Sequence, residues 1–488
     1  MNSQSDTAPA RFDLVIEGGE VIDGTGRDRF KTDVGIRGNV IVALGDLDQA
    51  KTTSRVSARG RIVAPGFIDA HTHDDRAVLS SPEMAAKVSQ GVTTVVAGNC
   101  GISLSPLESQ EIPPPLNLLG NREWYRFGSF SKYREAIQAN PPALNIVPLI
   151  GHTTLRVGAM DDLNRAATLA ERDCMAEQLE AALAEGAVGL STGLAYPTAK
   201  AAPMEEVLAL AERLKPYGGI YTTHMRNEGD RVVESVEESL ETGRRAGVPI
   251  VISHHKATGR KNWGRTRATL ALIEQAGRQQ KVHLDVYPYT ASSTVLLLEH
   301  VRTAEKVIVT WSEAYPDLAG KDLGDIAKAW GCSTAQAVSK LQPAGAIYEH
   351  MHADDLQRVL SFPQAMIGSD GLPHDVFPHP RLWGSFPRVL GFYSRESQLF
   401  SLEEAVRRMT GLTAEVFGLK NRGTIREGAF ADLVVFNPET IQDVASFKQP
   451  KQPATGVERV IVGGQLVWDQ AVSVDNRPGR LLTRTAGD

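Results

Sequence analysis

The segment Gly66–His73, with the sequence GFIDAHTH, decides the fold because it ends an apolar, β-branched run with two histidines. Residues two apart in a strand point to the same face, so His71 and His73 can offer their imidazoles to one divalent ion. Four more metal-compatible side chains directly follow short apolar runs: Cys100, His224, His254 and Asp370. Together, the six side chains predict a metal centre at the ends of strands.

Between residues 61 and 367, short β-branched runs alternate with longer helical patterns, which is typical of βα units around a parallel sheet. The eight runs span residues 62–70, 92–98, 144–151, 188–191, 220–224, 249–254, 282–287 and 365–369. The clearest helical patterns cover residues 166–185 and 231–246. Eight strands with crossover helices predict a (β/α)8 TIM-like barrel over residues 62–417, with catalytic residues at the C-terminal strand ends.

The two ends of the chain differ from this repeat, because their short strands are punctuated by glycine and lack a helical period. Residues 16–22 (IEGGEVI) and 461–467 (IVGGQLV) share a strand, Gly-Gly, strand pattern, although two unrelated hairpins would look the same. We expect residues 1–61 and 418–488 to build one small β-sandwich.

About eighty residues separate the seventh and eighth runs, more than a helix and two loops require. We expect a helical insert at about 290–350 over the barrel mouth. Such an insert serves either as a lid or as a purely structural cap.

The composition is that of an ordinary globular enzyme. With 488 residues, 42% of them hydrophobic, the chain can form one large core and a smaller domain. A net charge of -6 and the absence of Lys/Arg runs give no reason to expect a nucleic-acid or membrane partner. The three scattered cysteines and the lack of a long apolar span lead us to expect a cytoplasmic protein. The sequence leaves the oligomeric state open.

Cys100 follows a buried-strand pattern that ends in a glycine-containing turn. Taken alone it would more often be a small buried hydrophobe, but at a barrel mouth a thiolate is a strong zinc ligand. His224 and His254 end the neighbouring fifth and sixth runs. The resulting Cys-His-His set leaves the fourth tetrahedral position for water or substrate, as a catalytic zinc requires. His255 points to the other strand face and is expected to pack.

Asp370 ends the eighth run and faces the same mouth. A carboxylate beside a metal site can take a proton from attacking water and return it to a leaving amine. The alternative is a turn-forming aspartate before Gly371. We predict that Asp370 is the general base.

The chain resembles the N-acyl-D-amino-acid deacylases, also called D-aminoacylases, of the amidohydrolase superfamily over essentially its full length. Five motifs carry the resemblance: residues 65–73 (PGFIDAHTH), 98–101 (GNCG), 253–256 (SHHK), 367–373 (IGSDGLP) and 379–384 (HPRLWG). The resemblance implies a tight Zn2+ site at Cys100, His224 and His254, with the cysteine in place of the bridging lysine or glutamate of other members. It also implies a weaker second metal at His71 and His73, and Asp370 as the general acid/base.

An amino-acid product needs a cation for its α-carboxylate. Arg381 is the best candidate, because a guanidinium holds a carboxylate bidentately and Arg381 lies in the loop after the eighth run. The resemblance implies the same role and adds Tyr287 as a second contact. The full set of predicted substrate contacts is Arg381, Tyr287, Lys256, Ser293 and Tyr196.

The side-chain preference rests on fewer residues. Lys256 lies two residues after His254 on the same strand face, so its ammonium can pair with an acidic side chain, although apolar-selective relatives also carry this lysine. Apolar-selective relatives tend to have a bulky aromatic residue in place of Ala195, and residues 262–265 (NWGR) resemble the acid-selective branch. That branch has arginine where our alignment places His300; with a register shift of two, Arg302 would take its place.

We therefore predict a zinc-dependent N-acyl-D-glutamate deacylase. N-acyl-D-aspartate or apolar N-acyl-D-amino acids are alternative substrates, and the D-stereospecificity follows from the resemblance alone. A cyclic-amide hydrolase is a more distant alternative and would usually have a bridging lysine where this chain has Cys100. The intact ligand set argues against a non-enzymatic protein of the same fold.

Overall fold

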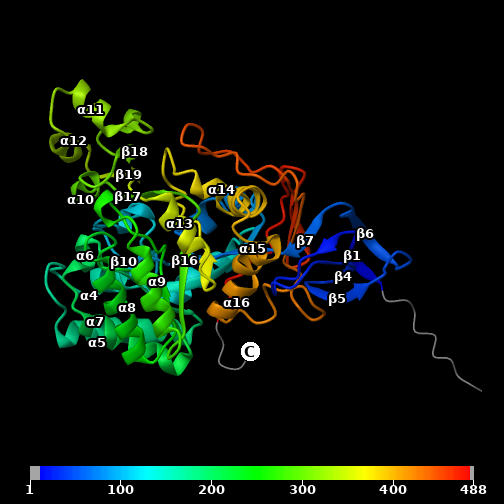
Figure 1. Cartoon of the computed structure of the whole chain (residues 1–488). Helices are drawn as coiled ribbons and strands as arrows, with labels where there is room; N and C mark the ends of the chain where they lie inside the picture. Colours follow the sequence, from blue (N-terminus) through cyan, green and yellow to red (C-terminus); the bar gives the residue numbers. More distant parts are fainter. Residues whose placement is uncertain (1–10, 484–488) are drawn as a thin grey trace, which may run out of the picture.

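Eight parallel strands form the centre of the computed structural model, which describes residues 11–483 (Figure 1). Residues 1–10, with most of the polar N-terminal segment, and residues 484–488 lie outside the described residues. In order around the sheet the strands are β8 (Phe67–Asp69), β9 (Val92–Ala97), β12 (Asn145–Gly151), β13 (Gly189–Gly193), β14 (Ile220–His224), β15 (Ile250–Ile252), β16 (Val282–Val286) and β20 (Ala365–Ile367).

The first and last strands of this sheet meet and close the ring. The amide of Ala70 donates to Ile367 O at 3.1 Å, and the amide of Asp370 donates to His71 O at 2.8 Å. The strands are almost wholly buried, as expected when helices cover a closed parallel sheet. The predicted (β/α)8 barrel is confirmed, and each of the eight predicted runs overlaps a barrel strand.

Helices follow the strands around the barrel. They include α3 (Phe130–Ala139), α5 (Leu169–Ala184), α7 (Met204–Ala211), α8 (Val232–Ala246), α9 (Thr266–Ala276), α13 (Ala353–Leu360), α15 (Leu402–Met409) and α16 (Gly411–Phe417). A capping box formed by Thr168 and Glu171 begins α5. The last two helices of the barrel are separate, because Thr410 leaves the helical backbone between α15 and α16.

Both chain ends build a small sandwich beside the barrel, at the right of Figure 1. One sheet contains β1 (Phe12–Glu17), β4 (Asp33–Arg37), β5 (Val40–Gly45) and β6 (Thr52–Ser57). The other contains β2 (Glu20–Val21), β3 (Phe30–Lys31), β7 (Ile62–Pro65), β21 (Leu433–Phe436), β22 (Val457–Val462), β23 (Gln465–Asp469) and β24 (Val472–Ser473). Side chains of both sheets, among them Ile36 and Val435, share one apolar core. The predicted β-sandwich is confirmed.

Two details of the small domain differ from the prediction. The run 62–70 is two strands, since β7 pairs with β21 in the sandwich and only β8 joins the barrel. The small-domain sheet therefore extends past the predicted boundary at residue 61. The similar segments 16–22 and 461–467 also diverge: the second is the β22–β23 hairpin, whereas β1 and β2 lie in different sheets.

The insert between β16 and β20 is not purely helical, which corrects our expectation. It contains a three-stranded antiparallel sheet in the order β17 (Ala291–Val295), β19 (Ala344–Glu349), β18 (Lys306–Ser312). The helices are α10 (Leu298–Val301), α11 (Leu323–Ala329) and α12 (Thr334–Leu341). The insert projects from the barrel at the upper left of Figure 1. Within residues 11–483, no helix has the length and apolar character needed to cross a membrane.

Candidate metal centre

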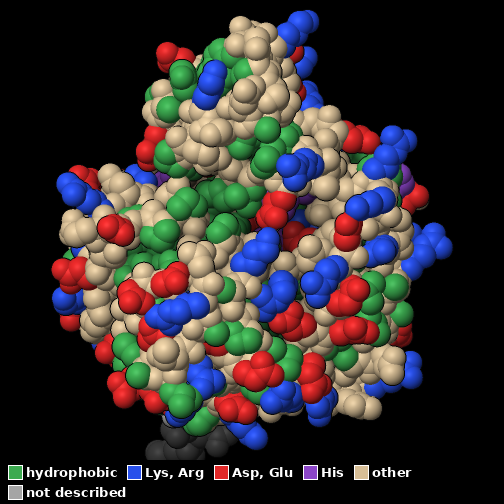
Figure 2. All heavy atoms as spheres, turned by 90° about the vertical axis from the view of Figure 1, so that its left-hand side faces the viewer, with side chains coloured by type: hydrophobic (Ala, Val, Ile, Leu, Met, Phe, Trp, Pro, Cys, Tyr) green, Lys and Arg blue, Asp and Glu red, His purple; other side chains and the backbone are tan. Residues whose placement is uncertain are grey.

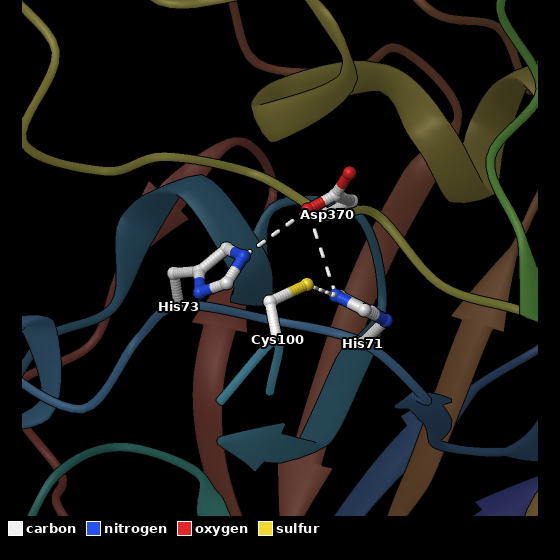
Figure 3. Close-up of side chains that lie close together, drawn as sticks. All are labelled: His71, His73, Cys100 and Asp370. Carbon is white, nitrogen blue, oxygen red and sulfur yellow. Dashed lines mark hydrogen bonds and ion pairs between the residues drawn. The ribbon is translucent and has the colours of Figure 1, made fainter. Parts of the chain in front are cut away.

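All six predicted metal-compatible side chains lie just beyond the C-terminal ends of barrel strands or in their last residue, and all are buried. They form two groups whose ligand atoms lie within 4.8 Å of one another. The first group is His71, His73, Cys100 and Asp370, and the second is Cys100, His224 and His254. Figure 3 shows the first group converging on one point, with the sulfur of Cys100 between the two histidines. The structure thus brings together every residue of the predicted centre.

Cys100 is shared by both groups. Its Sγ lies 3.2 Å from His71 Nε2 and 3.3 Å from His254 Nε2, and the latter nitrogen lies 3.1 Å from His224 Nδ1. Burial by itself raises the pKa of the thiol, but the positive charges of His71 and His254 outweigh it and hold the pKa well below its usual value. A thiolate surrounded by imidazole nitrogens is a donor set that fits Zn2+.

Sharp backbone turns aim three of these side chains into the barrel mouth. Cys100, His254 and Asp370 have φ angles of 54°, 37° and 50°, in the left-handed region that residues other than glycine rarely adopt. Such strained conformations persist only where the surrounding structure holds them, and they cluster at functional sites. The amide of His254, for example, donates to Asp285 Oδ1 at 2.8 Å.

Two carboxylates contact the outer ring nitrogens of the metal-site histidines. Asp285 Oδ2 lies 3.2 Å from His71 Nδ1, and Glu228 Oε1 lies 2.9 Å from His254 Nδ1. A carboxylate in this position holds the proton of a neutral ring on Nδ1, so that the other ring nitrogen is left for a metal. At His254 the Lys256 ammonium also contacts Nδ1, at 2.8 Å. Neither carboxylate was among the residues predicted for the site. The sequence pattern could have indicated Asp285, because it is a charged residue inside an apolar run. Glu228 lies in a polar loop, where a glutamate does not stand out.

A buried lysine joins the two strand ends that carry the first group. Lys87, on the short helix α2 (Ala85–Val88), donates to Asp69 Oδ2 at 2.8 Å and to Ser369 Oγ at 2.6 Å. Asp69 Oδ1 accepts the amide of Ser369 at 2.7 Å. Asp69 precedes His71 and Ser369 precedes Asp370, so this network fixes the distance between the histidines and the carboxylate.

Asp370 lies between His73, a candidate metal ligand, and the guanidinium of Arg381. Its Oδ1 is 3.2 Å from His73 Nε2, and its Oδ2 is 2.9 Å from Arg381 Nη1. Burial by itself raises the pKa of Asp370, but the Arg381 guanidinium and the hydrogen bond from His73 hold it well below its usual range. The carboxylate is therefore ionised and able to accept a proton.

Arg381 is fully buried at the start of α14 (Arg381–Arg388). Its Nη2 donates to Ser293 O at 3.0 Å, and its Cζ lies 4.5 Å from the centre of the Tyr287 ring. Among the residues that the structure describes, Nε and Nη1 have no hydrogen-bond partner, since the Asp370 ion pair lacks hydrogen-bond geometry. Nη1 already faces the Asp370 carboxylate, so Nε is the donor left for the carboxylate of a ligand.

A cavity lies over the metal-compatible residues His73, His224, His254 and Asp370. Three of the predicted substrate contacts line it, Lys256, Tyr196 and Ser293, together with His300, Leu118 and Leu372, whereas Arg381 and Tyr287 do not. Lys256 Nζ donates to Glu228 Oε1 at 2.7 Å and lies 5.6 Å from the centre of the Tyr287 ring. Arg302 is exposed and does not line the cavity. Figure 2 shows that the molecule is hollowed beneath the insert, with hydrophobic side chains around the hollow.

Comparison with known proteins identifies the family of this chain. A profile of the amidohydrolase family matches residues 55–468. This chain belongs to the amidohydrolase family. Three proteins of Alcaligenes xylosoxydans xylosoxydans are similar over nearly their whole length. A D-aminoacylase is 51% identical over 99% of this chain and 100% of its own length. An N-acyl-D-aspartate deacylase is 47% identical and an N-acyl-D-glutamate deacylase 46% identical, each over 98% of this chain and 97% of its own length.

Solved structures place this amidohydrolase among the D-aminoacylases and confirm the resemblance. A D-aminoacylase crystal structure superimposes with a TM-score of 0.95 at 50% identity, over 97% of this chain and all of the other. The N-acyl-D-glutamate deacylase of Bordetella bronchiseptica, complexed with zinc and a phosphonate mimic of the tetrahedral intermediate, also gives 0.95, at 45% identity and the same coverage. A D-hydantoinase shares the fold alone, with a TM-score of 0.61 at 15% identity.

Proposed function

We propose that this amidohydrolase hydrolyses the amide bond of N-acyl-D-amino acids, with N-acyl-D-glutamate as the substrate, zinc at Cys100, His224 and His254, and a weaker second metal at His71 and His73. The observation that carries the proposal is the place of Asp370, which contacts His73 on one side and Arg381 on the other. A proton acceptor and a carboxylate anchor thus lie side by side, as an acylated amino acid requires.

The residues divide the reaction as follows. Zinc, when bound, supplies Lewis acidity toward the amide carbonyl and toward water. The Asp370 carboxylate takes a proton from the water that adds to the carbonyl carbon. It then delivers that proton to the amine nitrogen as the C–N bond breaks, which yields a carboxylate and a free amino acid. Glu228 and Asp285 keep His254 and His71 in the tautomers that leave Nε2 free.

The substrate's α-carboxylate binds at Tyr287 in this proposal. The Arg381 guanidinium lies 4.5 Å from the centre of the Tyr287 ring, so a carboxylate there is within its reach. Tyr196, whose hydroxyl lies 2.9 Å from Thr294 Oγ1, and Ser293 belong to the same cavity.

The side chain of the substrate is a separate question. Lys256 supports an acidic side chain, because it is a buried cation that lines the cavity. One observation favours a second candidate, an N-acyl-D-amino acid with a neutral side chain: Lys256 already has the Glu228 carboxylate at 2.7 Å, and Arg302 is exposed. N-acyl-D-aspartate is the shorter acidic alternative.

We also propose a cytoplasmic location for the protein. All three cysteines are free thiols, which supports this proposal.

Amine release from N-acetyl-D-glutamate, N-acetyl-D-aspartate, N-acetyl-D-leucine and N-acetyl-L-glutamate tests the proposal, with zinc-loaded and chelator-treated protein side by side. We expect zinc-dependent turnover of the D-compounds, led by D-glutamate. Preference for D-leucine would keep the reaction and replace the substrate by the neutral candidate. Absence of turnover on all four would overturn the proposal and direct the next assay to cyclic amides.

A further inference from the structure

The cavity above the metal centre has two chemically different walls. The insert contributes hydrogen-bonding groups: Ser292 and Thr294 on β17, His300 on α10, and His350 directly after β19. The barrel loops after β9 and β20 contribute Leu118 and Leu372. A substrate of the proposed kind has two arms, an amino-acid side chain and an acyl chain, which differ in the same way.

We infer that His350, with Ser292, determines side-chain specificity by hydrogen-bonding an oxygen at the polar end of the substrate's side chain. This inference rests on the proposed deacylase function. It adds to the reading of the cavity, because selectivity then depends on a hydrogen-bonding oxygen as well as on charge pairing with Lys256. The substrate class is N-acyl-D-amino acids whose side chain ends in a carboxylate or carboxamide, such as D-glutamate and D-glutamine.

The hydrogen bonds of His350 support this role. His350 is 3% exposed, and its Nε2 lies 2.8 Å from Ser292 Oγ. Its Nδ1 is buried and has no partner within residues 11–483. Buried polar atoms are nearly always paired, so a ring nitrogen left unpaired beside a ligand cavity fits a contact that the ligand completes. Burial lowers the pKa of His350 to about 3, and a neutral imidazole has one donor and one acceptor.

The backbone around His350 is held in place by a segment that the sequence analysis had singled out. The carbonyl of His350 accepts hydrogen bonds from the Gly259 amide at 2.8 Å and from Trp263 Nε1 at 3.3 Å. Trp263 belongs to residues 262–265, which resemble the acid-selective branch, yet no residue of that segment lines the cavity. Residues 262–265 can therefore affect selectivity indirectly, because Trp263 holds the backbone of His350 in place.

If Arg381 holds the α-carboxylate, the amino-acid side chain lies toward the insert and the acyl chain toward Leu372. Arg381 Nη2 donates to the carbonyl of Ser293, so an α-carboxylate held there lies beside β17. The side chain leaves the same carbon atom and reaches the neighbouring groups on Ser292 and His350. The acyl group is attached to the reacting carbonyl near Asp370, from which Leu372 is two residues away.

Steady-state kinetics on the zinc-loaded full-length protein test the inference, with N-acetyl-D-glutamate, N-acetyl-D-glutamine and N-acetyl-D-leucine as substrates. His350→Phe keeps a ring and removes both nitrogens. We expect KM for the first two substrates to rise about tenfold or more, with kcat/KM for D-leucine within about threefold and the zinc content unchanged. Ser292→Ala should act in the same direction with a smaller effect.

His283→Phe is the matched control, since His283 is a half-buried histidine near the start of β16, at the opposite end of the barrel. It should leave all three KM values unchanged. A parallel loss on all three substrates in both His350→Phe and Ser292→Ala, or no change in either variant, would overturn the inference. If the wild type cleaves none of the substrates, the proposed deacylase function fails instead. If it cleaves D-leucine and neither variant changes the ratios, the deacylase stands and His350 loses its role.

Discussion

The barrel mouth and the insert wall face the same cavity but are built differently. At the barrel mouth every reacting group has a charged neighbour: Asp370 has Arg381 and His73, and His254 has Glu228. On the insert wall the groups are neutral, and a nitrogen of His350 has no partner among the described residues.

This contrast teaches how the molecule separates reaction from selection. Charged groups with several partners on closed barrel strands are held in one geometry, which proton transfer and metal binding require. Neutral groups on an inserted sheet leave hydrogen bonds for the ligand to complete. Changes at the barrel mouth should therefore lower turnover of every substrate, whereas changes on the insert side should alter the ranking of substrates.

The largest effect should follow Cys100→Ala. The variant removes the one atom shared by both metal groups, so we expect loss of zinc and activity no higher than that of chelator-treated wild type. Atomic absorption on dialysed protein measures the metal. Cys174→Ala, at a half-buried thiol on α5, is the control, and full zinc retention in Cys100→Ala would remove Cys100 from the ligand set.

Asp370→Asn should lower kcat by about 10²–10⁴-fold on every substrate, because the amide keeps the size of the side chain but cannot accept the proton. Zinc content should be unchanged. Single-turnover rates with each D-substrate provide the measurement. Substantial residual activity would refute the role of Asp370 as base.

Glu228→Gln should weaken zinc binding by about 10–100-fold, since His254 loses the carboxylate that fixes its tautomer. Competition with a chromophoric chelator measures the dissociation constant without any assay of activity. Glu238→Gln, on α8 and paired with Arg226, removes a glutamate charge away from the metal groups and should leave zinc affinity unchanged. Equal affinity in the wild type and Glu228→Gln would break the proposed link between Glu228 and the metal.

Lys256→Met should raise KM for N-acetyl-D-glutamate by more than for N-acetyl-D-leucine. The double variant with Glu228→Gln removes both charges of the pair and controls for an unpaired buried carboxylate. KM values for the two substrates in both variants give the comparison. Equal losses on the two substrates would leave selectivity to the insert wall alone.

The smallest effect is expected for Asp375, which bears on the thermal stability of the protein and not on its activity. Burial raises the pKa of Asp375, in the loop beneath the insert, from 3.8 to about 7. Because the folded-state pKa lies above the unfolded value, the stability that Asp375 contributes is complete below pH 4 and is lost as pH rises through about 7. Asp375→Asn should raise Tm at pH 8 by about 1 °C relative to wild type for each kcal/mol of relieved strain, given the size of the chain. The measurement is the Tm of wild type and of Asp375→Asn at pH 5 and at pH 8. If the two proteins differ in Tm by the same amount at both pH values, the prediction is contradicted.

The same contrast explains what the sequence could predict. Candidate ligands at the ends of apolar runs, such as His71 and Cys100, could be predicted from the sequence because a parallel barrel brings all its strand ends to one mouth. The sheet of the insert was missed, since its strands pair over long sequence distances that a local pattern does not reveal. Lys87 and Glu228 were missed for a related reason: each acts through residues far away in the chain.

The junction at Gly66 has a consequence for how the protein is made. The strand before it, β7, pairs with β21 near the C-terminus, and the strand after it carries the chain directly to His71. Gly66 itself leaves no space for a side chain, since a Cβ there would meet Thr93 at 2.1 Å. During synthesis the ribosome has therefore released almost the whole chain before the strand leading into the first metal group is fixed. We expect the first metal group to stay unfixed in nascent chains that stop short of residue 433.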